Sequence, residues 1–190
     1  MPILRKIKSH EQKRALLRAA RNTACDMLGR TLGPPQPESA IDGRFGGAFV
    51  TFWAGKRLRG CVGSFASTDD IIATVREVTR RSLADPRFAS HAITADELSD
   101  LEIEISILSA LEPTTDPLAL QRGIHGIMIT RGSKSGCFLP QVGTESGWST
   151  EEFLCNCCTM KAGLPAGAWR EGDTEVSLFT ADVFSESRLH

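Results

Sequence analysis

The chain has 190 residues and contains no run of about 18 consecutive apolar residues, the length that a membrane-spanning helix needs. Its first residues (MPILRKIK) lack an apolar run followed by a small-residue cleavage site, so we expect no secretion. The formal net charge is only −1, which argues against a dedicated basic nucleic-acid-binding domain. Walker, GxGxxG, HExxH and GxSxG motifs are absent, so nucleotide-dependent phosphoryl transfer and the common zinc-protease and esterase mechanisms have no support.

Hydrophobic residues make up 41% of the chain and charged residues 24%, as in ordinary soluble globular proteins. The length suits one compact domain, or one domain split into two lobes. Six cysteines without an export signal indicate reduced thiols in a cytoplasmic protein. No motif indicates a bound cofactor, and none is expected.

Positive charge is concentrated in residues 1–21, against the single acid Glu11. Such a run can contact nucleic-acid phosphate or an anionic membrane. The favoured interpretation is the solvated face of an amphipathic helix, because an apolar stripe accompanies it. The basic residues are Arg5, Lys6, Lys8, Lys13, Arg14, Arg18 and Arg21.

The N-terminal half predicts two helices and three strands. Ser9 and Gln12 form a capping box for a helix that ends near residue 29, and an irregular loop follows around residues 33–37. Its apolar stripe comprises Leu16, Ala20, Ala24, Met27 and Leu28.

Residues 48–53 and 57–65 flank Gly55-Lys56 and predict a β-hairpin. Residues 68–70 cap a second helix that runs to about Leu83. Strict alternation predicts a strand over residues 101–108.

The C-terminal half predicts strands at residues 124–130, 137–142 and 176–184. Asp116-Pro117 begins a short helix, and a capping box of Ser149 and Glu152 begins another that ends near Gly163. These elements predict an α+β fold, with a mostly antiparallel sheet and flanking helices.

The hexapeptide at residues 58–63 (LRGCVG) carries the most chemical information. On a regular strand Arg59 and Cys61 share a face and lie about 6.5–7 Å apart. A guanidinium at that range favours the thiolate, and Gly60 and Gly63 let a ligand approach closely. These residues predict a site for a small anionic or carbonyl-containing molecule, with Cys61 as candidate nucleophile.

A structural role for the same residues is also open. A Gly55-Lys56 turn places Cys61 opposite Val50 and Arg59 opposite Phe52, which makes Cys61 a small buried hydrophobe and Arg59 a stacked cation. The glycines then supply only a β-bulge.

His125 lies between glycines at the start of a predicted strand, where it can act as a general base or proton donor. A lone histidine is more often a structural hydrogen-bonding group. The sequence alone does not place His125 beside Cys61.

Three further polar groups favour structural roles. Glu102, Glu104 and Ser106 share one strand face that can hold a metal or pair with Arg59, but a solvated sheet face explains them as well. Asp85 and Arg87 are expected to pair and hold their loop. Cys155, Cys157 and Cys158 cluster on the last long helix without the further ligands that zinc needs, so no metal site is expected.

The hexapeptide resembles the signature of the AMMECR domain family, and other stretches match that family in the same order. The similarity covers about residues 10–186, which indicates a single domain over residues 5–187. The matching stretches are 85–88 (DPRF), 101–109 (LEIEISILS), 125–126 (HG), 136–142 (GCFLPQV) and 161–165 (KAGLP) followed by Trp169.

The resemblance implies an α+β body of two unequal subdomains, with a cleft between them close to the hexapeptide. Because the chain resembles the stand-alone prokaryotic form, it also implies Memo-like and radical-SAM proteins as companions. The family brings no established reaction. We therefore expect a small-molecule- or partner-binding module with Arg59, Gly60 and Gly63 as binding residues; the alternative is an enzyme that uses Cys61 with help from Arg59 and His125.

Overall fold

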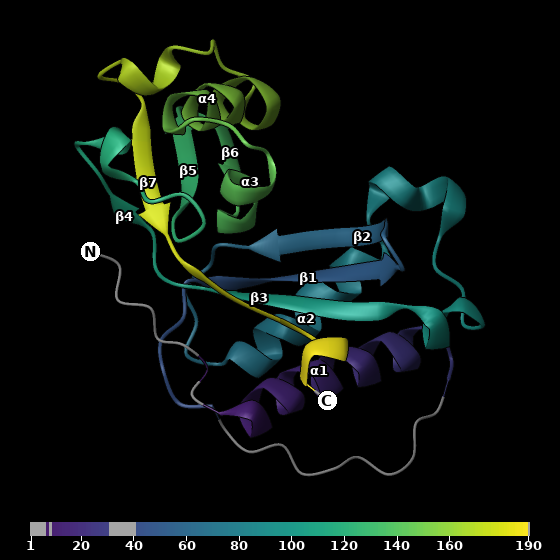
Figure 1. The fold of residues 1–190 in the computed structure, drawn as a ribbon. Coiled ribbons are helices and arrows are strands. Elements are labelled where there is room, and N and C mark those ends of the chain that lie inside the picture. The colour runs from purple at the N-terminus through teal and green to yellow at the C-terminus, as the bar shows by residue number, and fades with distance from the viewer. Residues whose placement is uncertain (1–6, 8, 31–40, 190) are drawn as a thin grey trace. The chain divides into compact units, whose positions relative to one another are not determined.

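A computed structural model describes residues 7, 9–30 and 41–189 and shows helices together with antiparallel sheets (Figure 1). The α+β prediction is therefore confirmed. The described residues divide into two compact units. The smaller unit is Ser109–Ala181, and the larger takes its described residues from Arg5–Leu108 and Asp182–His190. None of the helices among the described residues is long and apolar enough to cross a membrane.

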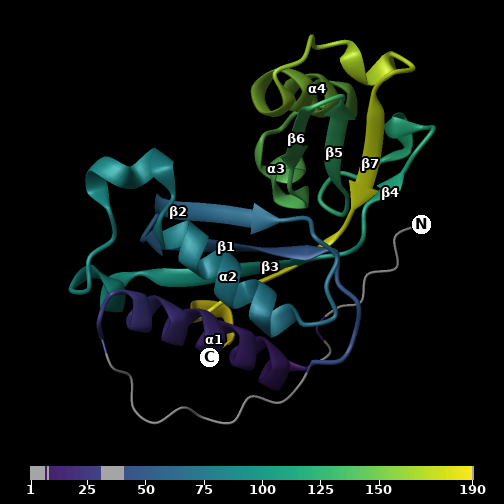
Figure 2. The same ribbon diagram turned by 180° about the vertical axis from the view of Figure 1, so that it is seen from behind.

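The larger unit has a four-stranded sheet in the order β2-β1-β3-β8. Helices α1 and α2 pack on one face of this sheet, and they run along the same side of it in Figure 2. The elements are α1 (His10–Met27), β1 (Gly47–Ala54), β2 (Arg57–Ser64), α2 (Ile71–Leu83), β3 (Glu102–Leu108) and β8 (Ala181–Ser185). Short 3-10 helices span Pro86–His91, Glu97–Asp100 and Ser187–Leu189.

The core of the larger unit follows the predicted periodicities. Strand β3 buries Ile103, Ile105 and Ile107 against the helices, and its other face carries the polar residues. Ser9 caps α1 by accepting a hydrogen bond from the Gln12 backbone, as predicted. Met27 is an exception to the predicted stripe, because its side chain is 47% exposed in the last turn of α1. The loop predicted around residues 33–37 lies outside the described residues.

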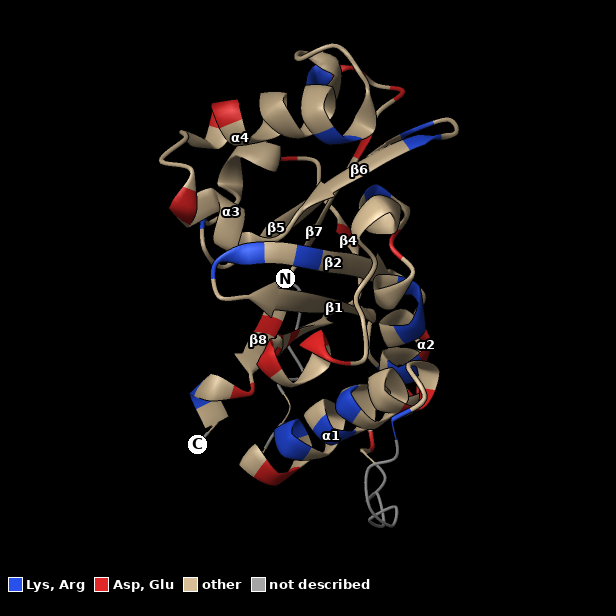
Figure 3. Cartoon of the chain, turned by 90° about the vertical axis from the view of Figure 1, so that its right-hand side faces the viewer, with Lys and Arg blue, Asp and Glu red and all other residues tan. Residues whose placement is uncertain are grey.

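Several basic side chains of α1 bind the C-terminal segment of the chain. Lys13 pairs with Asp182, and Arg14 donates to the carbonyl of Leu189. Arg21 pairs with Glu186 and donates to the carbonyls of Leu98 and Leu101. Figure 3 shows the blue cations along α1. These contacts give Lys13, Arg14 and Arg21 a structural role, so the helix face that carries them is not simply solvated. The other basic residues before Ser9 lie outside the described residues, and the expectation on nucleic-acid contact stays a prediction.

The smaller unit has its own four-stranded sheet in the order β4-β7-β5-β6. Its separate core contains Phe153, Leu154 and Trp169. The elements are β4 (Glu112–Pro113), β5 (Gly126–Arg131), β6 (Lys134–Phe138), α3 (Pro140–Glu145), α4 (Thr150–Asn156), a π-helical segment (Cys157–Ala162) and β7 (Glu175–Phe179), with 3-10 helices at Pro117–Ala119 and Ala168–Arg170.

Two strand predictions in this half were wrong. The strand predicted over 137–142 ends at Phe138, because Pro140 begins helix α3 at a position where its missing N–H costs nothing. The strand predicted over 176–184 is two strands, β7 and β8, which belong to different sheets. The capping box of Ser149 and Glu152 is confirmed, and the helix it begins ends at Gly163 with φ of 62°.

Candidate functional site

Strand β2 carries the hexapeptide, and its pairing with β1 contains a bulge at Arg59. Cys61 lies opposite Thr51 and Gly60 opposite Phe52, while Leu58 is the next residue paired with β1. The predicted register, with Cys61 opposite Val50, was therefore wrong by one residue. The extra residue in β2 also breaks the alternation from which Arg59 and Cys61 were placed on one face.

Arg59 is buried, with 5% of its surface exposed, and both Nη atoms of its guanidinium donate hydrogen bonds. Nη1 donates to Glu97 Oε1 at 2.6 Å, and Nη2 donates to the His91 carbonyl at 3.1 Å. The hydrogen bond from Arg59 is the main cause that lowers the pKa of Glu97 to about 2. Arg59 thus ties the segment between His91 and Glu97 to strand β2, and neither predicted partner, Phe52 or a strand glutamate, is needed to hold its charge.

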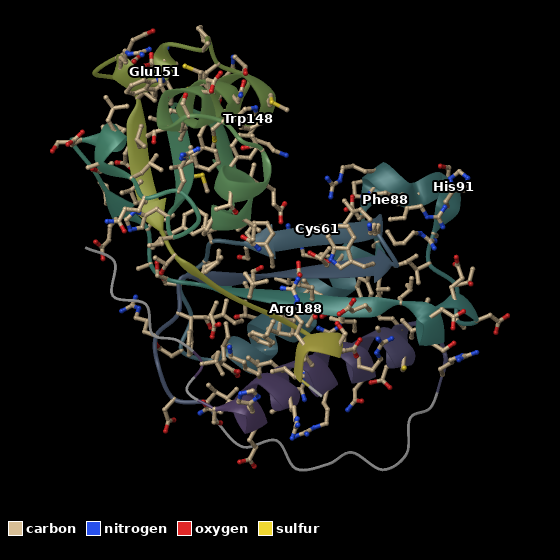
Figure 4. All side chains as sticks on the ribbon, viewed as in Figure 1. Cys61, Phe88, His91, Trp148, Glu151 and Arg188 are labelled. Atoms are coloured by element: carbon tan, nitrogen blue, oxygen red, sulfur yellow. The ribbon has the colours of Figure 1, made fainter. Side chains whose placement is uncertain are left out.

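Cys61 is half-buried on β2, and Figure 4 labels it on that strand. Its sulfur accepts a hydrogen bond from Thr51 Oγ1 at 3.3 Å across the hairpin. Its backbone N–H donates to Asp85 Oδ2 at 3.0 Å, and its carbonyl accepts from Arg87 Nη2 at 2.8 Å. The loop after α2 therefore binds β2 at Cys61 through the side chains of Asp85 and Arg87.

The predicted pair of Asp85 and Arg87 is confirmed. Arg87 donates to both carboxylate oxygens of Asp85, from Nε at 3.0 Å and from Nη2 at 2.7 Å. These bonds, aided by the Cys61 N–H, lower the pKa of the buried Asp85 to about 2. The hydrogen bond to Asp85 is likewise the main cause that raises the pKa of Arg87, and the negative charge of a Cys61 thiolate adds to it. The guanidinium that binds the Cys61 backbone is thus that of Arg87, whereas the guanidinium of Arg59 binds Glu97 and His91.

Gly60 and Gly63 are explained by packing within the larger unit. A Cβ on Gly60 would lie 2.3 Å from the Ser82 carbonyl oxygen, because the end of α2 rests on the strand. There the Ser82 hydroxyl accepts from the Val62 N–H and donates to the Val50 carbonyl. A Cβ on Gly63 would lie 2.3 Å from the Phe49 ring. Their proposed role in binding stays a prediction.

The sheet face that carries Cys61 lies opposite the face covered by α1 and α2. It presents half-buried Phe49 and Trp53 from β1, with Glu104 and the buried Ser106 opposite Thr51 and Phe49 on β3. Glu102 accepts hydrogen bonds from Ser187. Among the residues that the structure describes, no three metal-ligating side chains come together.

His125 lies in the smaller unit, just before β5, and is 7% exposed. Its Nδ1 accepts a hydrogen bond from the Gln121 N–H at 3.0 Å. Burial lowers the pKa of His125, although Glu112 acts in the opposite direction. Since Cys61 belongs to the larger unit, the pairing of these two residues remains a prediction.

We expect the neutral His125 to make stability depend on pH. Its pKa is lower in the folded than in the unfolded chain, so below about pH 6.5 the unfolded chain binds more protons and the folded state loses stability. His125→Asn keeps an acceptor for Gln121 but does not titrate. Urea unfolding of both proteins between pH 8 and 5 should show the wild type losing stability relative to the variant as pH falls; a constant difference would contradict this.

The fold and the site together define an α+β protein whose signature segment joins a β-hairpin to an ordered loop. Residues 11–184 match the AMMECR1 family. A protein of Methanothermobacter thermautotrophicus is 34% identical over 187 residues, covering 94% of this chain and 96% of that protein. One from Thermococcus onnurineus is 36% identical over 184 residues, covering 90% of this chain and 88% of the relative.

A solved structure shows the same fold. The crystal structure of the uncharacterized protein PH0010 from Pyrococcus horikoshii superposes with a TM-score of 0.80 at 31% identity, covering 94% of this chain and 93% of that one. The chain belongs to the AMMECR1 family. Sequence reasoning missed Thr51 and Glu97 at the site, and it did not predict that Arg87 binds the Cys61 carbonyl. The only available signal for the Arg87 contact was that segments 58–63 and 85–88 both match the family.

Proposed function

We propose that this protein is a binding module for small carboxylate-bearing molecules, with Arg87 and Cys61 at the recognition surface. The observation that carries the proposal is the fixed position of the Arg87 guanidinium, which Asp85 holds against the backbone carbonyl of Cys61. In this proposal Arg59 does not contact the ligand, because its side chain is buried and its guanidinium is paired with Glu97.

Arg87 suits carboxylate recognition because its orientation is fixed before a ligand arrives. Its Nε and Nη2 bond to Asp85 and to the Cys61 carbonyl, while the side chain stays 58% exposed. Nη1 has two N–H groups and no hydrogen bond assigned to it among the described residues. A planar guanidinium held in this way binds carboxylate oxygens with little further loss of entropy. Asp85 offsets part of its charge, so we expect modest affinity.

The surroundings of the Cys61 thiol favour a role in binding over a role in covalent catalysis. Among the described residues, the hydrogen bond assigned to its sulfur comes from Thr51, a hydroxyl and not a base. An activated nucleophile needs a neighbouring base or a comparable source of thiolate. A thiol of this kind can instead accept or donate a weak hydrogen bond to a ligand.

Binding can be tested by nuclear magnetic resonance on the intact, isotopically labelled chain with a panel of small mono- and dicarboxylates. We expect shifts of the backbone amides of Cys61, Gly63 and Arg87. Cys61→Ser should retain them, whereas Arg87→Gln should lose most of the affinity. Arg80→Gln, which changes a half-exposed arginine on α2, is the matched control and should bind as the wild type does. Shifts confined to other residues, or equal affinity in Arg87→Gln, would refute the proposal.

The proposed module acts with Memo-like and radical-SAM proteins in the cytoplasm, as the family resemblance implies. Reduced thiols fit that compartment, and the described cysteines are free. Size-exclusion chromatography of mixtures with each candidate partner from the same cell tests this part. Elution of all components as separate peaks at micromolar concentration would refute the proposed association but would leave the proposed carboxylate site untouched.

The second candidate function is an enzyme in which Cys61 attacks a small carbonyl-containing or anionic substrate. It is favoured by one observation, the binding of a guanidinium to the backbone carbonyl of a half-buried cysteine. Arg87 would replace Arg59 as the assisting cation, with His125 as the predicted base. This function requires an unusually reactive thiol, which the rate of Cys61 alkylation in the folded protein measures.

A further inference from the structure

The last long helix of the smaller unit carries two thiols one turn apart, in a region that the proposed function does not use. Cys155 lies in α4, and Cys158 lies in the π-helical segment that follows it. Residues three apart on a helix have Cβ atoms about 5–6 Å apart, and a disulfide needs about 3.5–4.5 Å. The two Cβ atoms are therefore roughly one to two ångströms too far apart for a disulfide.

The helix changes its hydrogen-bonding pattern between these two residues. Regular α-helix ends at Asn156, and π-helix runs over Cys157–Ala162. Such junctions interrupt the regular backbone ladder, so a small local rearrangement costs less there than inside a continuous helix. A disulfide between Cys155 and Cys158 would require a shift of this kind at the junction.

One tryptophan contacts both sulfurs. Trp169 Nε1 donates to Cys155 Sγ at 3.4 Å. The backbone N–H of Trp169 acts on the Cys158 thiol as a hydrogen-bond donor, which opposes the rise in its pKa that burial causes. Trp169 is itself in the core, with 7% of its surface exposed. A bond between the two sulfurs would therefore change the surroundings of this ring.

We propose that Cys155 and Cys158 form a thiol–disulfide site that reacts with small disulfides such as oxidised glutathione. The geometry assigns the two thiols different roles. Cys155 is half-buried and can be reached by a small disulfide, whereas Cys158 is fully buried. Reversible disulfides of this kind in reducing compartments are typically redox-sensing or catalytic.

The reaction takes place in two exchange steps. The Cys155 thiolate attacks one sulfur of oxidised glutathione, which forms a mixed disulfide and releases one glutathione thiolate. Cys158 then passes its proton to the departing glutathione sulfur while its own sulfur attacks Cys155, and the second glutathione leaves as a thiol. Two protein thiols are oxidised to one disulfide, and one small disulfide is reduced to two thiols.

Cys157 lies between these residues in sequence and provides a matched control. It is as fully buried as Cys158, but its sulfur donates to the Gly136 carbonyl on β6 at 3.5 Å. Burial strongly raises the pKa of its thiol. Cys157 is therefore turned toward the sheet and takes no part in the exchange.

Mass spectrometry of the intact chain, exposed to glutathione buffers and then digested after glutamate, tests the proposal. The fragment 153–171 contains Cys155, Cys157 and Cys158 alone among the six cysteines. In oxidising buffer the wild-type fragment should lose two hydrogen atoms, and dithiothreitol should restore them. Trp169 emission should change in step with oxidation in a Trp53→Phe, Trp148→Phe background.

The variants separate this site from other oxidation. Cys157→Ala should still form the disulfide, Cys158→Ala should instead trap one glutathione on Cys155, and Cys155→Ala should do neither. Circular dichroism checks that each variant is folded, and Cys155→Ala, at a half-buried position, tests the site even if Cys158→Ala does not fold. Loss of the disulfide in Cys157→Ala, or an unoxidised wild-type fragment in fully oxidised buffer, would overturn the proposal.

Discussion

Gly60→Ala is expected to lower the free energy of unfolding by about 3 kcal/mol, near the upper end of the cost of overpacking a core. The new Cβ would lie 2.3 Å from the Ser82 carbonyl oxygen and 3.3 Å from its carbon. Both atoms belong to the backbone at the end of α2, so no side-chain rotation relieves the contact. Moving α2 away would also break the Ser82 hydroxyl bridge between Val50 and Val62.

Urea unfolding followed by circular dichroism measures this effect. Gly172→Ala is the control, because a Cβ added to Gly172 would have nothing within 4 Å and the φ of this residue is not positive. We expect the control to change the free energy of unfolding by less than about 0.5 kcal/mol. A Gly60→Ala protein as stable as the control would show that α2 does not require this glycine.

Asp85→Asn is expected to cost about 2 kcal/mol at pH 7. The pKa of Asp85 falls from its usual 3.8 to about 2 in the folded protein, and each unit corresponds to about 1.4 kcal/mol. Because the folded-state pKa is lowered, this stabilisation is present above about pH 4 and is lost as the pH falls from 3.8 toward 2. Asparagine keeps an acceptor for the Cys61 N–H but loses the charge that Arg87 binds.

The difference in unfolding free energy between wild type and Asp85→Asn should therefore be constant from pH 7 to 5 and shrink at lower pH. Carboxyl chemical shifts of Asp85 give its titration directly where the protein remains folded. The exposed Asp69→Asn is the control and should leave stability nearly unchanged at every pH. A difference that grows on acidification would contradict the assigned direction.

Local signals in the sequence were enough for much of the larger unit. The alternation of β3, the Gly55-Lys56 hairpin and the Ser9 cap depend on neighbouring residues, and the structure confirms them. The hairpin register was not predictable in this way. It depends on the bulge at Arg59 and on Ser82, which is distant in sequence and inserts its hydroxyl between the two strands.

The division of the last apolar stretch shows the same limit. Residues 176–184 read as one strand, because nothing in their alternation marks Thr180 as a boundary. The break is produced by pairing with distant segments. Ser109 accepts from the Thr180 N–H through its side chain and donates to the Thr180 carbonyl, and β7 and β8 then join different sheets.

The segments of the candidate site could be identified from the sequence, but the contacts between them could not. The hexapeptide and the Asp85–Arg87 pair were both identified from the sequence, and the pair is confirmed. Which arginine lies beside Cys61 depends on how the loop after α2 folds back onto β2. Arg59 instead reaches Glu97, a residue 38 positions away whose role no local pattern indicates.

The rate at which Cys61 reacts with iodoacetamide tests most directly whether this residue binds or catalyses. Trypsin releases residues 60–76, which contain Cys61 alone, so mass spectrometry can follow this thiol in the folded protein and in urea between pH 6 and 9. If Cys61 is a binding contact, it should react no faster when folded than when unfolded at each pH. A folded-state rate roughly tenfold higher, abolished in Arg87→Gln, would contradict the binding account and identify an activated nucleophile.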